Sequence, residues 1–244
     1  NLADSRDDVN ESNVYGGRAD LLLQPADKLS LRFAAFAQDI DRDGTAAADF
    51  GLASGEPIDG ELDQRRLRAE PFEQQFRLVS GTLTYDFENA GLTAISSYQT
   101  VDSYAIPDVS AFFVPALAAN GIVLGSIDVE KRNETDKFTQ EVRLAAAGAL
   151  FDWSIGGFYT DEESHQFQRL NSFLPGGAAF PVNLLTVDLP STYEEYAGFG
   201  TLTWHLTPKL DLTGGLRYAH NSQHFEQIGS GPLIFSVPER SVSD

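Results

Sequence analysis

The stretch EEYAGFGTLTWHLTPKLDLTGGLRYAHNSQH, residues 194–224, decides the fold of this chain. From Tyr196 to Leu206, apolar residues or glycine occupy the even-numbered positions, while polar residues occupy most of the odd-numbered ones. The turn TPK, residues 207–209, then reverses the chain, and the alternation resumes from Leu210 to Tyr218. A period of two residues is the signature of a β-strand with one apolar face. We therefore predict an antiparallel hairpin whose strands, about ten residues each, match the length that a tilted strand needs to cross a bilayer.

Three further hairpins precede this one and show the same alternation. Their strands are expected at residues 15–23 and 29–37, 77–85 and 92–101, and 138–144 and 151–159. The four reversals lie near Ala26, Glu88, Gly148 and Pro208, which are 62, 60 and 60 residues apart. This near-constant spacing predicts eight antiparallel strands in four hairpins. We also expect all eleven prolines to lie outside the strands, because proline cannot donate to a ladder.

The connections at the two ends of the predicted strands differ in length. The reversals take about three to six residues, whereas the connections 39–75, 102–136 and 161–193 are all longer than thirty residues. Compact soluble domains have mostly short connections on both sides. Short turns at one end and long loops at the other are typical of an outer-membrane β-barrel, with periplasmic turns and extracellular loops. Within the loops, we expect a short helical turn around residues 64–69. We expect the apolar run 111–119 to fold back into the lumen or to pack on another loop.

Aromatic side chains near the predicted strand ends support the same interpretation, because aromatic girdles mark the two interfaces of a membrane barrel. A soluble β-sandwich also has one apolar face, buried instead of lipid-facing, and remains an alternative. The asymmetry of the connections and the aromatics together favour the membrane. The aromatics in question are Tyr15, Tyr85, Tyr98, Trp153, Tyr159, Tyr196, Trp204 and Tyr218.

Composition narrows the class of protein further. The 244 residues carry 36 acidic and 17 basic side chains, a formal net charge of −19, and a nucleic-acid partner is therefore not expected. Cysteine is absent, which excludes disulfides and thiolate metal sites. The chain has no methionine and begins at Asn1 without a signal-like segment, so we expect a processed product or a fragment.

The polar face of the predicted strands carries charged residues that should point into the barrel lumen, where water, a plug or a ligand can satisfy them. A Lys or Arg that faced lipid near the bilayer midplane would cost about 2–4 kcal/mol. The absence of such residues from the opposite face therefore supports the register. The predicted lumen-facing set is Arg18, Asp20, Lys28, Arg32, Glu141, Arg143, Asp211 and Arg217.

Patterns that could indicate a metal site are weak. Residues 39–44, DIDRDG, match the start of an EF-hand loop, but Phe50 stands where a bidentate Glu belongs, so a solvated acidic loop is expected. His220 and His224, with Glu226 nearby, have the spacing of a helical zinc site, yet on a strand they lie about 13 Å apart. No metal and no cofactor is predicted.

Patterns that could indicate catalysis are weaker still. No nucleophile elbow, P-loop or dinucleotide fingerprint is present. The acidic run 161–163 is expected to be a charged loop at the membrane edge instead of an acid/base pair. We predict no catalytic residues and no enzymatic activity.

The hairpins resemble those of TonB-dependent outer-membrane receptors. The segment QEVRL at residues 140–144 and the turn LTPKLDLTGGLRY at residues 206–218 are the most characteristic, and the resemblance covers the hairpins but not the loops. It implies a 22-stranded barrel around an N-terminal plug, in the bacterial outer membrane, that imports a scarce ligand with energy from a TonB-type protein. Residues 1–244 would be part of a single β-barrel domain. No plug-like segment or energy-coupling box precedes Asn1, so gating is not assigned to these residues.

The implied function is import of a siderophore-, cobalamin- or glycan-like ligand. The alternatives are a smaller barrel that acts as porin, adhesin or structural anchor, and a soluble β-rich binding module. Closure of the barrel distinguishes these hypotheses. Eight strands that close on themselves would favour the structural anchor, whereas unpaired first and last strands would require neighbours and favour a section of a larger transporter. The ligand-binding residues are not predicted. The acidic loops disfavour capture of a strongly anionic ligand, although the basic cluster of Arg65, Arg66 and Arg68 could act locally.

Overall fold

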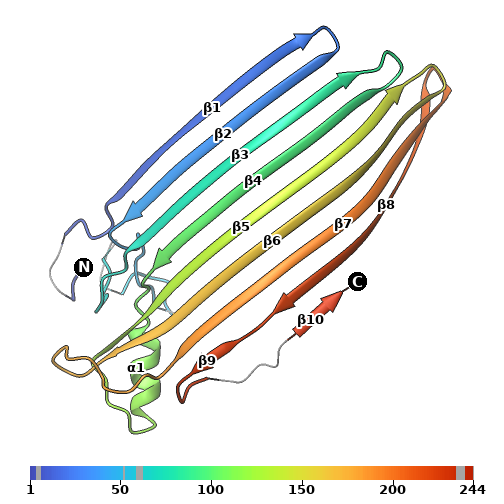
Figure 1. Ribbon diagram of the computed structural model, residues 1–244. Coiled ribbons are helices and arrows are strands. Elements are labelled where there is room, and N and C mark those ends of the chain that lie inside the picture. Colours follow the sequence, from blue (N-terminus) through green and yellow to red (C-terminus); the bar gives the residue numbers. More distant parts are fainter. Residues whose placement is uncertain (4–6, 52, 59–62, 235–239, 244) are drawn as a thin grey trace.

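The chain forms one curved antiparallel sheet (Figure 1). The computed structural model describes residues 1–3, 7–51, 53–58, 63–234 and 240–243. The sheet has ten strands in the order β1-β2-β3-β4-β5-β6-β7-β8-β10, and the short β9 pairs with β7. Each of the eight long strands lies beside its neighbour in sequence, which confirms the predicted all-β, four-hairpin order.

The first two hairpins are regular. They comprise β1 (Ser12–Ala26), β2 (Leu29–Arg42), β3 (Phe72–Asp86) and β4 (Gly91–Ala105). β2 and β3 pair without interruption from Leu29↔Tyr85 to Arg42↔Phe72, so every backbone group along this ladder has a partner. The turns between paired strands are short, as predicted, and the turn of the first hairpin consists of Asp27 and Lys28 alone.

The next strands are much longer than the sequence predicts. β5 spans Ser126–Ala147, β6 spans Phe151–Phe173 and β7 spans Thr186–Thr207, while β8 spans Leu210–Phe225. A strand of 22 residues is roughly 70 Å long, more than twice the thickness of a hydrocarbon core. These strands therefore continue beyond a bilayer on the side of the long connections. The predicted loop bounds were wrong, because the connections are residues 43–71, 106–125 and 174–185.

Proline is also found inside the strands, against the prediction. Pro25 lies near the end of β1, and Pro190 lies within β7 opposite His165. The carbonyl of Pro190 accepts the backbone N–H of Glu226, so the side of Pro190 that lacks an N–H faces the region just beyond Phe225, the last residue of β8. Proline is tolerated there because no ladder hydrogen bond is lost.

The connection between β4 and β5 contains the one α-helix of the described residues. Helix α1 (Ser110–Ala118) packs on β5, and its Leu117 joins a buried cluster with Leu124, Ile127, Leu170 and Leu184. The apolar run 111–119 thus packs on other loops and on the strand extensions, which was one of the two expected outcomes. The predicted helical turn at residues 64–69 is wrong, since this segment is extended and bent.

The two faces of the sheet differ as the alternation predicts. Large apolar side chains project outward and are exposed, and they form a continuous surface because cross-strand partners share a face. Gln140 and Ser96 are polar residues on this face that satisfy each other, since the Ser96 hydroxyl donates to the Gln140 side chain, which in turn donates to the carbonyl of Ile95 at 3.0 Å. The apolar side chains include Leu21, Phe33, Val79, Val142, Ile155, Leu202 and Leu216.

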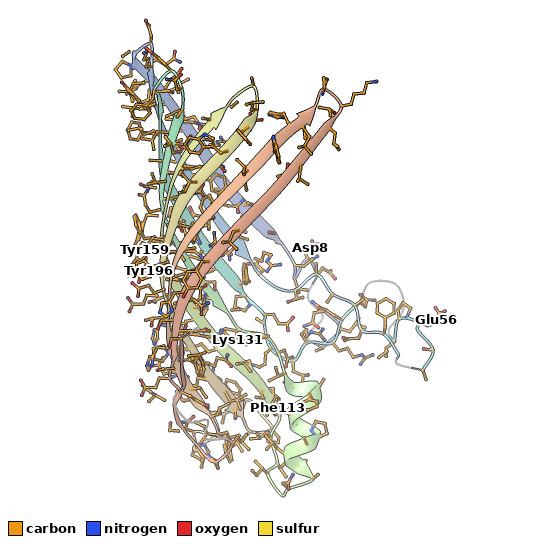
Figure 2. The ribbon with its side chains drawn as sticks, turned by 90° about the vertical axis from the view of Figure 1, so that its right-hand side faces the viewer. Asp8, Glu56, Phe113, Lys131, Tyr159 and Tyr196 are labelled. Carbon is orange, nitrogen blue, oxygen red and sulfur yellow. The ribbon has the colours of Figure 1, made fainter. Side chains whose placement is uncertain are left out.

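Aromatic residues border this apolar surface on both sides. On the loop side, the rings of Tyr159 and Tyr196 lie 4.8 Å apart, and on the turn side Phe151 and Trp204 lie 6.0 Å apart. Figure 2 shows Tyr159 and Tyr196 on the side of the sheet opposite to Lys131 and α1. Trp204 lies eight positions after Tyr196 in β7, roughly 26 Å along the strand. A strand tilted by about 35–45° would place the two rings about 18–21 Å apart along the membrane normal, somewhat less than the apolar band of about 25 Å in a membrane barrel.

The sheet has two open edges among the described residues. β1 pairs only with β2, and all its residues are exposed. β8 pairs with β7 and, over its last four residues, with β10. Figure 1 shows β1 and β8 at opposite edges of the sheet, with no pairing between them. A long unpaired edge is a template for another strand.

The difference between the two faces predicts which arginine substitutions disturb barrel assembly. In the full-length protein, Leu202→Arg or Val142→Arg should impair barrel assembly, because each places a charge on the apolar surface at a cost of about 2–4 kcal/mol. Thr203→Arg, on the opposite face of the same strand, should be tolerated. Heat-modifiable migration in gels measures folding, and equal migration of all three variants would contradict the assignment of the faces.

Candidate functional site

The inward face of the sheet carries ionic groups that pair across strands. On the first hairpin, the carboxylate of Asp20 binds the guanidinium groups of Arg18 and Arg32, each at 2.6 Å. All three residues belong to the predicted lumen-facing set, and the structure brings them together. Two guanidinium groups share one carboxylate, so this cluster keeps a net positive charge on this part of the wall.

A second ionic group lies on the last hairpins. Arg217 binds Glu195 at 2.5 Å, and the hydroxyl of Tyr193 donates to the same carboxylate at 2.7 Å. The guanidinium of Arg217 also lies over the ring of Phe158, 5.2 Å from its centroid. One strand away, Lys137 and Glu162 pair at 2.9 Å. Of these residues, only Arg217 was predicted. Glu195 adjoins the predicted strand that starts at Tyr196, on its polar face, whereas Lys137, Glu162 and Tyr193 lie in strand extensions that the alternation could not reveal.

The turn end of the wall has its own charged groups. His205 contacts Asp211 at 2.8 Å and Asp152 at 3.2 Å. Lys28 lies in the turn between β1 and β2 and binds Glu88 of the next turn. The prediction that Lys28 points into the lumen is therefore wrong, because it links two turns at the rim.

Glu141 and Arg143 differ from the other inward charges. They flank Val142 on β5, and alternation places both on the inward face. Within the described residues, neither side chain has a hydrogen bond or an ion pair, in contrast to Arg18, Asp20 and Arg217. Two opposite charges on an inward surface can therefore meet a complementary group from outside this sheet.

A row of uncharged polar side chains crosses the inward face between the aromatic border and the loops. In the strand register, Gln74 of β3 lies opposite Ser103 of β4, Ser103 lies opposite Asn133 of β5, and Asn133 lies opposite Gln166 of β6. These four residues are called the neutral row below. Hydroxyls in the next row, Thr135 and Ser164, bind each other at 2.6 Å. Amides and hydroxyls both donate and accept hydrogen bonds, so this surface can bind groups that do the same.

An ion pair fastens the loop 43–71 to the strand extensions. Arg68 binds Asp128 at 2.9 Å, and the carboxylate of Asp128 is 3% exposed. Asn171 donates to the other oxygen of Asp128 at 2.8 Å, and the guanidinium of Arg68 stacks 3.8 Å from the centroid of Phe173. This buried contact joins β5, β6 and the loop, and we call it the loop clasp.

Asp108 and Arg66 extend the clasp. The side chain of Asp108 accepts the backbone N–H groups of Leu67 at 2.6 Å and Arg68 at 3.1 Å. Arg66 binds Asp49 at 2.9 Å. Burial by itself lowers the pKa of the Arg66 guanidinium, but the hydrogen bond and charge of Asp49 raise it overall, so Arg66 keeps its charge. Two of the three arginines considered for ligand capture thus bind carboxylates of this chain.

The weak sequence motifs do not converge on a site. Asp39 and Asp41 lie on β2 instead of in a loop, and Asp39 binds Arg77 at 2.7 Å. The prediction of a charged loop at residues 161–163 is wrong, because these residues lie in β6. His220 and His224 are both in β8. Within the part of the chain that the structure describes, no group of three His, Asp or Glu residues is placed to hold a metal ion.

Among the described residues, no helix is long and apolar enough to cross a bilayer.

Comparisons with known proteins agree with this geometry. Residues 8–240 match the family model described as TonB dependent receptor-like, beta-barrel. No curated protein sequence matches the chain.

Solved structures show the same fold. The ferric yersiniabactin uptake receptor FyuA from Yersinia pestis is similar with a TM-score of 0.73 and 18% identity, over 96% of this chain and 33% of that one. The ferric citrate transporter FecA in its unliganded form gives a TM-score of 0.73 and 12% identity, over 97% and 32%. The siderophore receptor PiuA from Acinetobacter baumannii gives 0.69 and 13%, over 98% and 39%. The chain therefore spans about a third of the length of these proteins.

The loop clasp predicts a change in loop stability. Asp128→Ala should destabilise the packing of residues 43–71 by about 1–3 kcal/mol, because it leaves Arg68 and Asn171 without their partner. Trypsin should then cut the full-length protein at Arg65, Arg66 or Arg68 about tenfold faster. Asp102→Ala, which removes an exposed carboxylate from β4, serves as the control. Equal cleavage rates for the two variants would show that the clasp does not hold the loop.

Proposed function

Because this chain belongs to the TonB-dependent receptor-like β-barrel family, we propose that residues 1–244 are one section of a single β-barrel domain. The whole protein would lie in the bacterial outer membrane and import a scarce ligand with energy from a TonB-type protein. The observation that carries this proposal is the pairing of a continuous exposed apolar surface outside with a polar, cross-linked surface inside. The similar structures are receptors and transporters and not enzymes.

The open edges support a larger barrel. β1 and β8 each offer a long row of backbone groups to a neighbour, and a bilayer contains no water that could satisfy them. A closed barrel abolishes both edges. The remaining strands of the barrel are the partners that this requires, and a section of about a third fits the coverage of the similar structures.

Glu141 and Arg143 support a plug inside the barrel. They face inward at the level of the apolar band and have no partner in the described part of the chain. A plug domain could supply complementary charges to both. Burial against the plug without such partners would cost several kcal/mol per charge, so the plug surface should be complementary.

The class of ligand includes three candidates, namely ferric siderophores, cobalamin and oligosaccharides. FyuA and FecA are named for ferric complexes, which makes a ferric chelate the first candidate by similarity alone. A sequence identity below 20% indicates a shared fold but does not indicate a shared ligand. The chemistry of the inward surface is therefore the basis for choosing among the three ligand classes.

Conductance distinguishes the receptor from a passive porin. The full-length protein in planar bilayers should be closed to ions at rest, because a plug fills the lumen. Arg143→Glu should weaken plug docking by about 2–5 kcal/mol and produce measurable leak currents.

Thr203→Arg, which adds a lumen-facing charge near the turns, is the control and should stay closed. A wild-type protein that conducts like an open pore would contradict the proposal and support the porin.

A further inference from the structure

We propose that the ligand of this receptor is an uncharged, polyhydroxylated molecule of the oligosaccharide class, bound along the neutral row and the aromatic pair of α1. This inference rests on the import function proposed above and specifies its substrate. It differs from the ferric chelates for which the similar structures are named.

The neutral row has the chemistry that hydroxyl groups require. Gln74, Asn133 and Gln166 each offer an amide N–H₂ donor and a carbonyl acceptor, and Ser103 offers a hydroxyl. The register places the four side chains next to one another across β3–β6. Within the described residues, the side chain of Gln74 has no hydrogen-bond partner, so its capacity is open to a ligand or water. A row of such groups can bind successive hydroxyls.

Charged groups on the same surface are few and largely neutralised. Among the inward positions of β3–β7 between the aromatic border and the loops, the charged residues are Lys131, Lys137, Glu162 and Glu195. Lys137 binds Glu162 at 2.9 Å and Glu195 binds Arg217 of β8, so at this level, above Glu141 and Arg143, Lys131 alone keeps an uncompensated charge among the described residues. Recognition of carboxylates or phosphates relies on free Arg and Lys, above all on bidentate Arg. The arginines nearest the loops, Arg66 and Arg68, already bind Asp49 and Asp128.

Aromatic rings complete the surface. Phe112 and Phe113 of α1 contact each other edge to face, with centroids 5.1 Å apart, and Phe112 is 72% exposed. Figure 2 shows α1 with Phe113 on the same side of the sheet as Lys131. The C–H faces of a sugar ring can pack on an aromatic ring while its hydroxyls bind amides. An exposed aromatic pair on the same side of the sheet as a row of neutral polar groups therefore fits a sugar better than an anionic chelate.

The test measures binding to the full-length receptor in detergent by isothermal titration calorimetry. The probes are a panel of short neutral oligosaccharides with gluco-, xylo-, galacto- and manno- linkages, and ferric citrate as the anionic chelate. We expect at least one oligosaccharide to bind with an affinity that changes less than about twofold between low and high salt, because screening acts only on charges. Ferric citrate should not bind.

Adjacent residues of β3 provide matched variants. Gln74→Leu should weaken oligosaccharide binding about tenfold, which corresponds to the loss of one or two net hydrogen bonds. Gln75→Leu removes the same group from the outward face and should change the affinity less than about twofold. Ser103→Ala and Phe112→Ala should each weaken binding severalfold, and Ser103→Ala, which is smaller than the native residue, keeps the test valid if Gln74→Leu does not fold.

Several results would overturn the inference. These are salt-dependent binding of ferric citrate, no binding by any member of the neutral panel, or equal losses for Gln74→Leu and Gln75→Leu. Uptake into cells with and without a proton uncoupler separates this inference from the proposed function. Oligosaccharide binding without energy-dependent uptake would contradict import but support the proposed ligand class. Energy-dependent uptake of ferric citrate would support import but contradict the proposed ligand class.

Discussion

A backbone amide in the hydrocarbon core of a bilayer has no water to bind, and this constraint governs the spanning part of the chain. The antiparallel ladder is the response, with pairing that runs unbroken from Leu29↔Tyr85 to Arg42↔Phe72 and along the whole of β5 and β6. Once the ladder is fixed, alternation separates the side chains into two surfaces. The apolar surface meets lipid, and the polar surface must be satisfied inside. At the two edges of the sheet, β1 and most of β8 still have backbone groups without a partner strand among the described residues.

Above the aromatic border the constraint relaxes, and the structure changes accordingly. β5, β6 and β7 continue, but both of their faces are polar, since water now surrounds them. Here the carboxylates of Asp128 and Glu130 are almost fully buried under arginines, and α1 packs on Ile127 and Leu184. This upper part holds loops in place with ion pairs, while the neutral row below it stays open. The division fits a protein that fixes its loops firmly and presents hydrogen-bonding groups to a ligand.

The hairpins, their turns and their faces were predictable because a two-residue period with an apolar face is visible in any stretch such as 196–206. The strand extensions were not, because a strand such as 126–136 with charges on both faces has no hydrophobic period and looks like a loop. Pro190 was expected outside the strands for the same reason. Only the pairing shows that the side of Pro190 without an N–H faces the chain beyond Phe225, where the β7–β8 ladder has ended. The inward ionic groups were half predictable. Arg217 was predicted from its own strand, whereas its pairing with Glu195 required the arrangement of β7 and β8.

In this barrel section, even-numbered residues of β7 face lipid and odd-numbered residues face the lumen. Because this chain has no cysteine, single cysteines from Ala197 to His205 can be introduced one by one and spin-labelled in the full-length receptor in liposomes. Collision with oxygen, which concentrates in lipid, and with a water-soluble nickel chelate is then measured at each site. Oxygen maxima are expected at Gly198, Gly200, Leu202 and Trp204, and nickel maxima at the positions between them. Equal accessibility at neighbouring sites, or oxygen maxima on the odd-numbered positions, would contradict this orientation of β7.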